Sequence, residues 1–310
     1  MYFPYFRGKQ FELISVRENA ERFAQAGFVP VIEPVRESFG GLEKSLKAVC
    51  DAGGSAVVVV NPFHGDHSEN GEGISNLLKA YLPKREIAAG VLLTADMNLD
   101  EVVSCLKVHE DHNLTLLHAG FTQGKALAEA VAGNNVVRHL FLGSEDPLYR
   151  RNFKGQPRVL VRDGFKRRKR NLDYPPVEFF SVLHASFEEE GMDGFGDFLT
   201  VGDEFQESGG PAYSIAIHLT YIDPDDEDRM FVYHFKSLRS DTPADPAGKF
   251  AEALSALIET INRVDSKVLE TQAVLEFRSL HARGHFPGLG YVKKLSMQHH
   301  IETLAAFFKK

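Results

Sequence analysis

Cysteine is scarce in this sequence, with two residues among 310. Cys50 and Cys105 each lie within an amphipathic helical pattern, where a small buried side chain is the usual role. The chain has 13 histidines, yet the zinc spacing H-E-x-x-H and the Cys/His zinc spacings are absent. We therefore expect neither a disulfide nor a thiolate or zinc site.

Long apolar runs are also missing. No stretch approaches the ~20 apolar residues that span a bilayer, and the first nine residues lack the basic and apolar regions of a signal peptide. The sequence has no G-x-G-x-x-G after its first predicted strand, no G-x-x-x-x-G-K-[ST] and no G-x-S-x-G. We expect a cytoplasmic protein without a membrane partner, and neither a dinucleotide site, a P-loop nor covalent acyl chemistry.

Short β-rich runs alternate with helical patterns from the first residues onward. Several runs are continuously apolar, which is typical of parallel strands covered on both faces. Eight strands are predicted, at Tyr2–Phe6, Phe28–Ile32, Ala56–Val60, Ala88–Leu93, Leu114–Leu117, Val137–Leu142, Arg158–Val161 and Phe198–Val201. This repeat predicts a (β/α)8 TIM-like barrel over residues 1–205, with an open doubly wound sheet as the alternative.

The pattern changes after the eighth predicted strand. Two β-rich runs, Tyr213–Ile222 and Met230–Ser237, flank an acidic turn and predict an antiparallel hairpin. Helical periodicity follows in Phe250–Val264, Lys267–Leu280 and Leu295–Phe308. We expect residues 206–310 to form a hairpin and helical extension packed on the barrel, without a second core, so that the chain is a single domain.

Polar residues follow the predicted barrel strands, at the end where barrel enzymes place their sites. They are Arg7, Lys9, Glu33, Asn61, His64, Asp96, His118, Ser144, Glu145, Asp163, Asp203 and Glu204. Glu33 and Asp163 directly continue apolar strands, so we expect their carboxylates at the barrel mouth. The predicted catalytic residues are Glu33, His118, Asp163 and Asp203.

Three arrangements are open for the carboxylates of Glu33, Asp163 and Asp203. They hold Mg²⁺ or another divalent cation through oxygen ligands, or they divide into an acid and a base. In the third arrangement, Arg7, Lys9 and Arg162 neutralise them as a structural charge network.

The most concentrated charge in the chain is the run Lys166–Arg170, which follows the seventh predicted strand. Barrels commonly seat phosphate near the loops after strands seven and eight. A net charge of −8 argues against extensive nucleic-acid coating but leaves room for such a local patch. The predicted anion-binding residues are Arg7, Lys9, Arg167, Arg168 and Arg170, with a solvated surface run as the alternative.

The segment Tyr2–Glu12 (YFPYFRGKQFE), with Val29–Pro34 (VPVIEP), resembles the opening of the phage-type "beta protein" family and its uncharacterised bacterial relatives. Further similar blocks are Val60–Pro62, Leu117–Gly120, Arg162–Phe165, Gly196–Asp203, His218–Tyr221 and Phe286–Gly290. The resemblance implies a barrel-like fold and a setting in phages, mobile elements or defence-type gene clusters, sometimes beside a nuclease-like protein. It implies no assigned activity and no catalytic residue.

Two functional hypotheses stay open at this point. The first is a module that binds an anionic ligand (a nucleic acid, a nucleotide or another phosphorylated molecule) or a partner protein. The second is a metal-assisted phosphodiester hydrolase with its site at the barrel mouth. What occupies the barrel mouth would separate them.

Overall fold

The computed structural model describes residues 1–84, 86–143, 146–207, 210 and 212–309. The chain divides into two compact units. The first comprises residues 1–162 and 186–198, and the second residues 163–185 and 199–310. This division differs from the expected boundary at residue 205.

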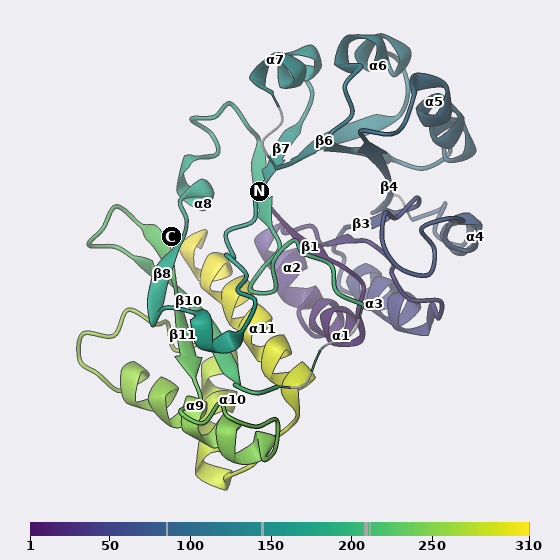
Figure 1. The fold of residues 1–310 in the computed structure, drawn as a ribbon. Helices are drawn as coiled ribbons and strands as arrows, with labels where there is room; N and C mark the ends of the chain where they lie inside the picture. Colours follow the sequence, from purple (N-terminus) through teal and green to yellow (C-terminus); the bar gives the residue numbers. More distant parts are fainter. Residues whose placement is uncertain (85, 144–145, 208–209, 211, 310) are drawn as a thin grey trace. The chain divides into compact units, whose positions relative to one another are not determined.

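The first unit is a closed barrel of eight parallel strands, so the predicted barrel is confirmed. Figure 1 shows its helices on the outer side of the strands. In order around the barrel, the strands are β1 (Tyr2–Phe6), β2 (Val31–Ile32), β3 (Ala56–Val59), β4 (Ile87–Thr94), β5 (Leu114–Ala119), β6 (Val136–Leu142), β7 (Arg158–Val161) and β9 (Gly194–Asp197). The helices of this unit are α1 (Gln10–Glu18), α2 (Ala20–Ala26), α3 (Gly40–Asp51), α4 (Glu72–Lys79), α5 (Leu99–Val108), α6 (Gly124–Ala130), α7 (Pro147–Arg150) and the 3₁₀ turn η1 (Arg151–Phe153).

Alternate residues of each strand point into the barrel, and those residues are mostly apolar, so they form its core. All four residues of β3 are buried, as their continuously apolar pattern predicts. The inward side chains include Val57 and Val59 of β3, Leu117 of β5 and Leu140 of β6. The other face of each strand packs toward the helical layer.

The eighth barrel strand lies earlier in the sequence than predicted. It is β9, and the predicted run begins just after it, where Phe198 packs into the barrel core and Leu199 has a φ of 51°. In β9, a Cβ at Gly194 would lie 2.6 Å from the carbonyl oxygen of Met1. Glycine allows this close approach of β1, but it contributes no apolar signal to the sequence pattern.

The second unit is built on a three-stranded antiparallel sheet in the order β10, β11, β8. Its strands are β8 (Val177–Ser181), β10 (Ala216–Asp223) and β11 (Arg229–Lys236). The predicted hairpin is confirmed as β10 and β11, whereas β8 comes from the connection between β7 and β9. The 3₁₀ turn η2 (Asn171–Asp173) precedes β8, and α8 (Leu183–Ser186) follows it.

Three helices complete the second unit: α9 (Pro246–Ile261), α10 (Gln272–Arg283) and α11 (Leu289–Phe307). They correspond to the three predicted helices. Helix α9 packs against β10 and β11, and α11 packs against β10 (Figure 1). Ile217, Leu219, Phe250, Leu257 and Phe277 belong to a buried apolar cluster of this unit. The second unit therefore has an apolar core of its own, which the sequence analysis did not expect.

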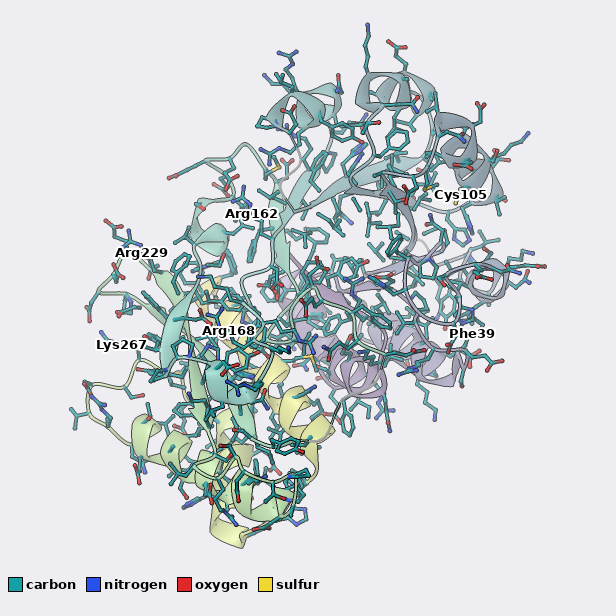
Figure 2. The ribbon with its side chains drawn as sticks, viewed as in Figure 1. Phe39, Cys105, Arg162, Arg168, Arg229 and Lys267 are labelled. Atoms are coloured by element: carbon teal, nitrogen blue, oxygen red, sulfur yellow. The ribbon has the colours of Figure 1, made fainter. Side chains whose placement is uncertain are left out.

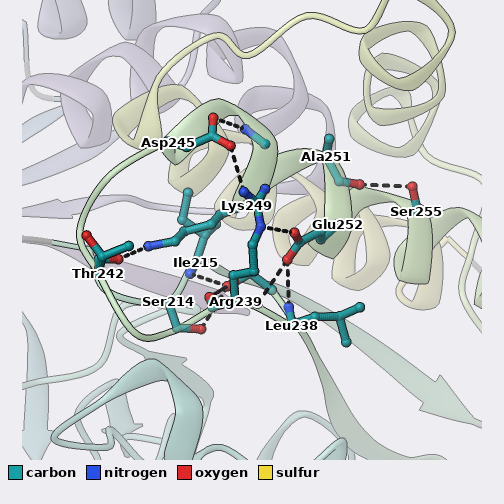
Figure 3. A network of polar contacts seen from close by, with 12 residues as sticks. Ser214, Ile215, Leu238, Arg239, Thr242, Asp245, Lys249, Ala251, Glu252 and Ser255 are labelled. Atoms are coloured by element: carbon teal, nitrogen blue, oxygen red, sulfur yellow. Dashed lines mark hydrogen bonds and ion pairs between the residues drawn. The ribbon is translucent and has the colours of Figure 1, made fainter.

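A polar network fixes the start of α9 (Figure 3). The Asp245 side chain accepts a hydrogen bond from the Gly248 backbone at 2.9 Å, and Pro246 occupies the first turn. Arg239 forms ion pairs with Asp245 and Glu252. Lys249 is buried and donates to the carbonyl oxygen of Thr242. The helix thus begins at a defined residue.

No helix formed by the described residues has both the length and the apolar character needed to cross a membrane.

Candidate functional site

The C-terminal end of the barrel contains a buried carboxylate, Glu33. It continues β2 on the inward side set by Val31, and it is fully buried. Glu33 forms an ion pair with Arg7 and accepts hydrogen bonds from the Tyr5 hydroxyl at 2.9 Å and from the backbone N–H groups of Phe63 at 3.0 Å and His64 at 3.2 Å. Its negative charge is therefore compensated within the barrel unit.

Arg7 is held on two sides by aromatic rings. Its guanidinium carbon lies 5.3 Å from the ring centre of Tyr5 and 5.4 Å from that of Phe198. The backbone N–H of Arg7 donates to the Glu12 carboxylate. The structure thus shows that Arg7 neutralises Glu33, as the structural charge network predicted. Arg162, which that network also included, pairs with Glu190.

Asn61 and Lys9 also lie after barrel strands. The Asn61 side chain bridges the backbone of β4, because its amide donates to the Leu92 carbonyl and its oxygen accepts from the Leu92 N–H, both at 2.8 Å. Lys9 occupies the N-cap position of α1. Ser144 and Glu145 lie outside the described residues.

His118 lies on the outward side of β5, because the preceding residue, Leu117, points into the barrel. Its ring stacks on Phe141, and its Nδ1 and Nε2 lie 2.7 Å from the Tyr149 hydroxyl and 3.0 Å from His139 Nδ1. Burial holds the pKa of His118 well below its usual value and lowers the pKa of His139 to about 4. The structure therefore places His118 in a buried neutral histidine pair, outside the inward-facing barrel core.

Asp163 and Asp203 lie together in the second unit. The Asp163 carboxylate accepts hydrogen bonds from the backbone N–H groups of Phe165 and Asp203, both at 2.8 Å. It thereby fixes the turn on which Asp203 sits. Glu33 belongs to the other unit. Among the described residues, no group of three or more His, Cys, Asp or Glu side chains could hold a metal ion. The magnesium site on Glu33, Asp163 and Asp203 stays a prediction.

The basic segment, defined as Lys166–Arg170, carries three ion pairs. Arg167 lies 3.6 Å from Glu204, Arg168 2.8 Å from Glu178, and Arg170 2.6 Å from Asp173. Lys169 is exposed. Lys166 is exposed as well, and its Nζ lies 5.9 Å from the ring centre of Phe179.

Phe179 begins a row of aromatic rings on one face of the three-stranded sheet. Phe179 contacts Phe231 edge to face, Phe231 stacks on Tyr221, and Tyr221 stacks on Tyr233. Phe179 is 39% exposed, and Phe231 and Tyr233 are half-buried. The alternate spacing of Phe231, Tyr233 and Phe235 was the available sequence signal. Sequence reasoning missed this aromatic row, because β8 was not recognised.

A depression of about 630 Å³ lies at the start of α5 and near the start of α6. Its lining includes Asn98, Glu101, Ser104 and Gln123. Asn98 and Glu101 cap each other's backbone N–H groups in a capping box. Their polar atoms therefore serve the helix.

No protein-family model and no curated protein matches this chain. The resemblance to the beta protein family therefore stays a prediction. Solved structures with some likeness include an N-acetylneuraminate lyase from Mycoplasma synoviae, with 12% identity and a TM-score of 0.41 over 64% of this chain and 67% of the other. A truncated 3-deoxy-D-arabino-heptulosonate 7-phosphate synthase from Thermotoga maritima has 13% identity and a TM-score of 0.34, with 64% and 75% covered. An enoyl reductase domain of MlnA from Bacillus amyloliquefaciens has 8% identity and a TM-score of 0.38, with 99% and 80% covered. At these identities the likeness concerns the fold alone.

Proposed function

We propose that this chain binds single-stranded nucleic acid on its second unit, through the basic segment and the aromatic row of the three-stranded sheet. One observation carries the proposal: the Lys166 ammonium lies over the exposed ring of Phe179. A cation and the exposed end of the aromatic row therefore lie side by side, with the half-buried Phe231 next to Phe179 and the buried Tyr221 beyond it. This combination is typical of proteins that bind single strands, where cations follow the phosphates and rings stack on the bases.

The ion pairs of the basic segment leave most of its charge accessible. The Arg170 side chain is 70% exposed and its partner Asp173 36% exposed, while the Glu204 side chain beside Arg167 is 72% exposed. Exposed pairs of this kind contribute about 0–1 kcal/mol. A phosphate that accepts two hydrogen bonds from an arginine can therefore replace the carboxylate.

Arg168 has a different part in this proposal. Its partner Glu178 is only 12% exposed, and Glu178 also lies 3.2 Å from His234 in the sheet (Arg168 is labelled in Figure 2). Tyr174 stacks on His234, and its hydroxyl accepts a hydrogen bond from the Arg168 backbone. We infer that Arg168 anchors the segment, while Lys166, Arg167, Lys169 and Arg170 contact phosphates.

The turn between β10 and β11 is acidic, but four of its five carboxylates have cationic partners. Arg229 pairs with Asp226 and Glu227, and Lys267 pairs with Asp223 and Asp225 (Arg229 and Lys267 are labelled in Figure 2). These pairs weaken repulsion of a polyanion near the aromatic row. We expect the bound strand to run from Phe179 toward the basic segment, away from this turn.

The proposal is tested by fluorescence anisotropy with a labelled oligothymidine across a series of NaCl concentrations. Four phosphate contacts predict a slope of log K against log[NaCl] of about −3, which weakens binding about 50-fold between 50 and 200 mM NaCl. The variant Lys166→Gln/Lys169→Gln should halve that slope. Phe179→Ala should weaken binding by about 5- to 100-fold, because it removes one stacking platform.

The matched control is Lys125→Gln/Lys154→Gln, which removes two exposed lysines of the barrel unit. It removes two positive charges, as the test variant does, and should leave the salt slope unchanged. Absence of binding at 50 mM NaCl would overturn the proposal. Equal effects of the two lysine pairs would also overturn it, because the attraction would then be a property of overall charge.

A further inference from the structure

Two histidines of the three-stranded sheet contact each other directly. His218 of β10 lies opposite His234 of β11 in the antiparallel ladder, so both side chains lie on the same face of the sheet. Their Nδ1 atoms are 2.7 Å apart. The Nε2 atom of His234 lies 3.2 Å from the Glu178 carboxylate, which pairs with Arg168 at 2.8 Å. The four side chains form one chain of polar contacts that ends at His218.

The carboxylate in this chain decides where the protons of both rings lie. A carboxylate only accepts hydrogen bonds, so His234 Nε2 carries a proton and donates it to Glu178. Burial lowers the pKa of His234 to about 4, and burial with the neighbouring His234 and Lys293 holds the pKa of His218 well below its usual value. Each ring is therefore neutral at pH 7 and carries one proton. His234 Nδ1 accepts a hydrogen bond from His218 Nδ1, which leaves a lone pair on His218 Nε2.

This lone pair is accessible from solvent. His218 is partly exposed, whereas His234 is buried. Among the described residues, His218 Nε2 has no hydrogen-bond partner, and it does not belong to the buried polar atoms that lack one. Phe165 and Tyr174 contact the ring edge to face, each with its ring centre 4.9 Å away, and hold its orientation. The sheet thus presents an oriented, unprotonated imidazole nitrogen to solvent.

The charges around the two histidines are positive. In addition to burial, the charge of Lys293 lowers the pKa of His218, and the charges of Arg168 and Lys236 lower the pKa of His234. Lys293 is exposed near the start of α11. Positive charges attract anionic ligands and raise their local concentration. A neutral nucleophile in these surroundings favours an electrophile that carries negative charge, such as a phosphoryl group.

We propose that His218 is a phosphoryl-acceptor histidine, modified on Nε2 by a small donor of the phosphoramidate class. The Nε2 lone pair forms the new N–P bond, while the P–N bond of the donor breaks and its amino group leaves as ammonia. The ring gains a positive charge, and its Nδ1 proton stays in the hydrogen bond to His234. Glu178 stabilises this charge through His234. No oxidant, reductant or further reactant takes part.

The test follows phosphorylation of the full chain by potassium phosphoramidate, with the modified residue located by mass spectrometry of peptides kept at alkaline pH. A peptide with a single histidine of ordinary pKa, about 6.5, reacts in the same solution as a reference. This peptide is mostly neutral at pH 7.5, and about one tenth of it is neutral at pH 5.5. Because His218 stays neutral, the ratio of its rate to the peptide rate should rise about tenfold between pH 7.5 and pH 5.5. Phosphorus NMR should show the Nε2 isomer.

Two variants test the contacts behind His218. His234→Gln keeps an acceptor for the Nδ1 proton but breaks the path to the carboxylate, and Glu178→Gln keeps the acceptor for His234 but removes the charge. Each should slow phosphorylation of His218 about tenfold, which corresponds to the loss of one charge-assisted hydrogen bond. His281→Gln, at an exposed histidine of α10, is the matched control and should leave the rate at His218 unchanged.

The attraction of the donor is tested with Lys293→Gln. This variant should react more slowly than the wild type at low salt, and the difference should disappear in 0.5 M NaCl, because salt screens the exposed charge. A rate ratio that is constant between pH 7.5 and pH 5.5, or phosphorylation on Nδ1, would overturn the proposal. An unchanged rate in His234→Gln and Glu178→Gln would overturn it as well. If one of these two variants does not fold, the other variant and the pH dependence of the wild type decide.

Discussion

Replacing Glu33 with alanine should remove much of the stability of the barrel unit. Glu33 is fully buried and Arg7 is 9% exposed, so the substitution leaves a buried guanidinium without its ion-pair partner. Breaking a buried pair in this way costs about 3–5 kcal/mol. The Tyr5 hydroxyl and the Phe63 and His64 N–H groups lose their acceptor as well, at about 1–3 kcal/mol for each group that water does not reach. Only the Tyr5 hydroxyl is fully buried, so with that one group we expect a total loss of about 4–8 kcal/mol, against about 5–15 kcal/mol for a typical domain.

Arg7→Met provides the matched comparison. It leaves Glu33 with the Tyr5 hydroxyl and two backbone donors, so it should cost about 2–3 kcal/mol, less than Glu33→Ala. Glu33→Gln keeps an acceptor for the donors but removes the charge. Combined with Arg7→Met, it forms a neutral pair, and the double variant should be more stable than the sum of the single losses predicts by about 1–3 kcal/mol.

The measurement is urea unfolding followed by circular dichroism, because the chain has no tryptophan for fluorescence. Each variant is compared with the wild type at the same pH and salt concentration. A loss below about 1 kcal/mol for Glu33→Ala would refute the reasoning, since that is the size expected of an exposed pair. Strict additivity of Glu33→Gln and Arg7→Met would refute the coupling.

Two further predictions concern acidity and backbone shape. Burial lowers the pKa of His139 and of His299 to about 4, so the folded chain takes up fewer protons than the unfolded chain as the pH falls through 6.5. Stability should therefore fall by about 2 kcal/mol per histidine from pH 7 to pH 5 in urea unfolding. His139→Gln should remove one such loss, and an unchanged pH dependence in this variant would contradict the prediction. Gly65 has a φ of 82°, and a Cβ there would overlap the backbone of Val35, so Gly65→Ala should cost more than about 2 kcal/mol. Gly155→Ala, at a φ of 93° with open space around it, should cost about 1 kcal/mol, and equal losses for the two glycines would contradict this account.

The barrel could be predicted because its strands carry their own signal. The four residues of β3 are buried on both faces and are all apolar, so the local sequence alone identifies the strand. β9 lacks that signal, because two of its four residues are glycine. The apolar residues just beyond it, Phe198 and Leu199, shifted the predicted strand toward them.

The second sheet was harder to predict because its pairing is distant along the chain. Val177 of β8 pairs with Tyr233 of β11, and nothing near β8 shows that partner. Local pattern found the β10–β11 hairpin, whose strands are joined by a short turn. The aromatic row depends on both strands, so it became visible only in the structure.

The roles of the candidate site residues also depend on segments that are distant in the sequence. Strand ends identified Glu33 and Arg7, but the sequence could not decide between a reactive carboxylate and a neutralised one, because that depends on contacts made by distant segments. For His118, the alternation of side chains along β5 decides which face of the strand it lies on. A shift of one residue along a strand reverses the face, and Leu117 takes the inward position.

The path of the chain between the two units has a consequence for synthesis. The polypeptide leaves the barrel unit after residue 162, returns at residue 186 and leaves again after residue 198. A ribosome therefore completes β8 before β9 closes the barrel, while the partner of β8, β11, has not yet been made. During that interval β8 is an unpaired strand with exposed Val177 and Phe179, open to pairing with other chains. No single cut in the sequence separates the two units, and a fragment ending near residue 205 would carry this unpaired strand permanently.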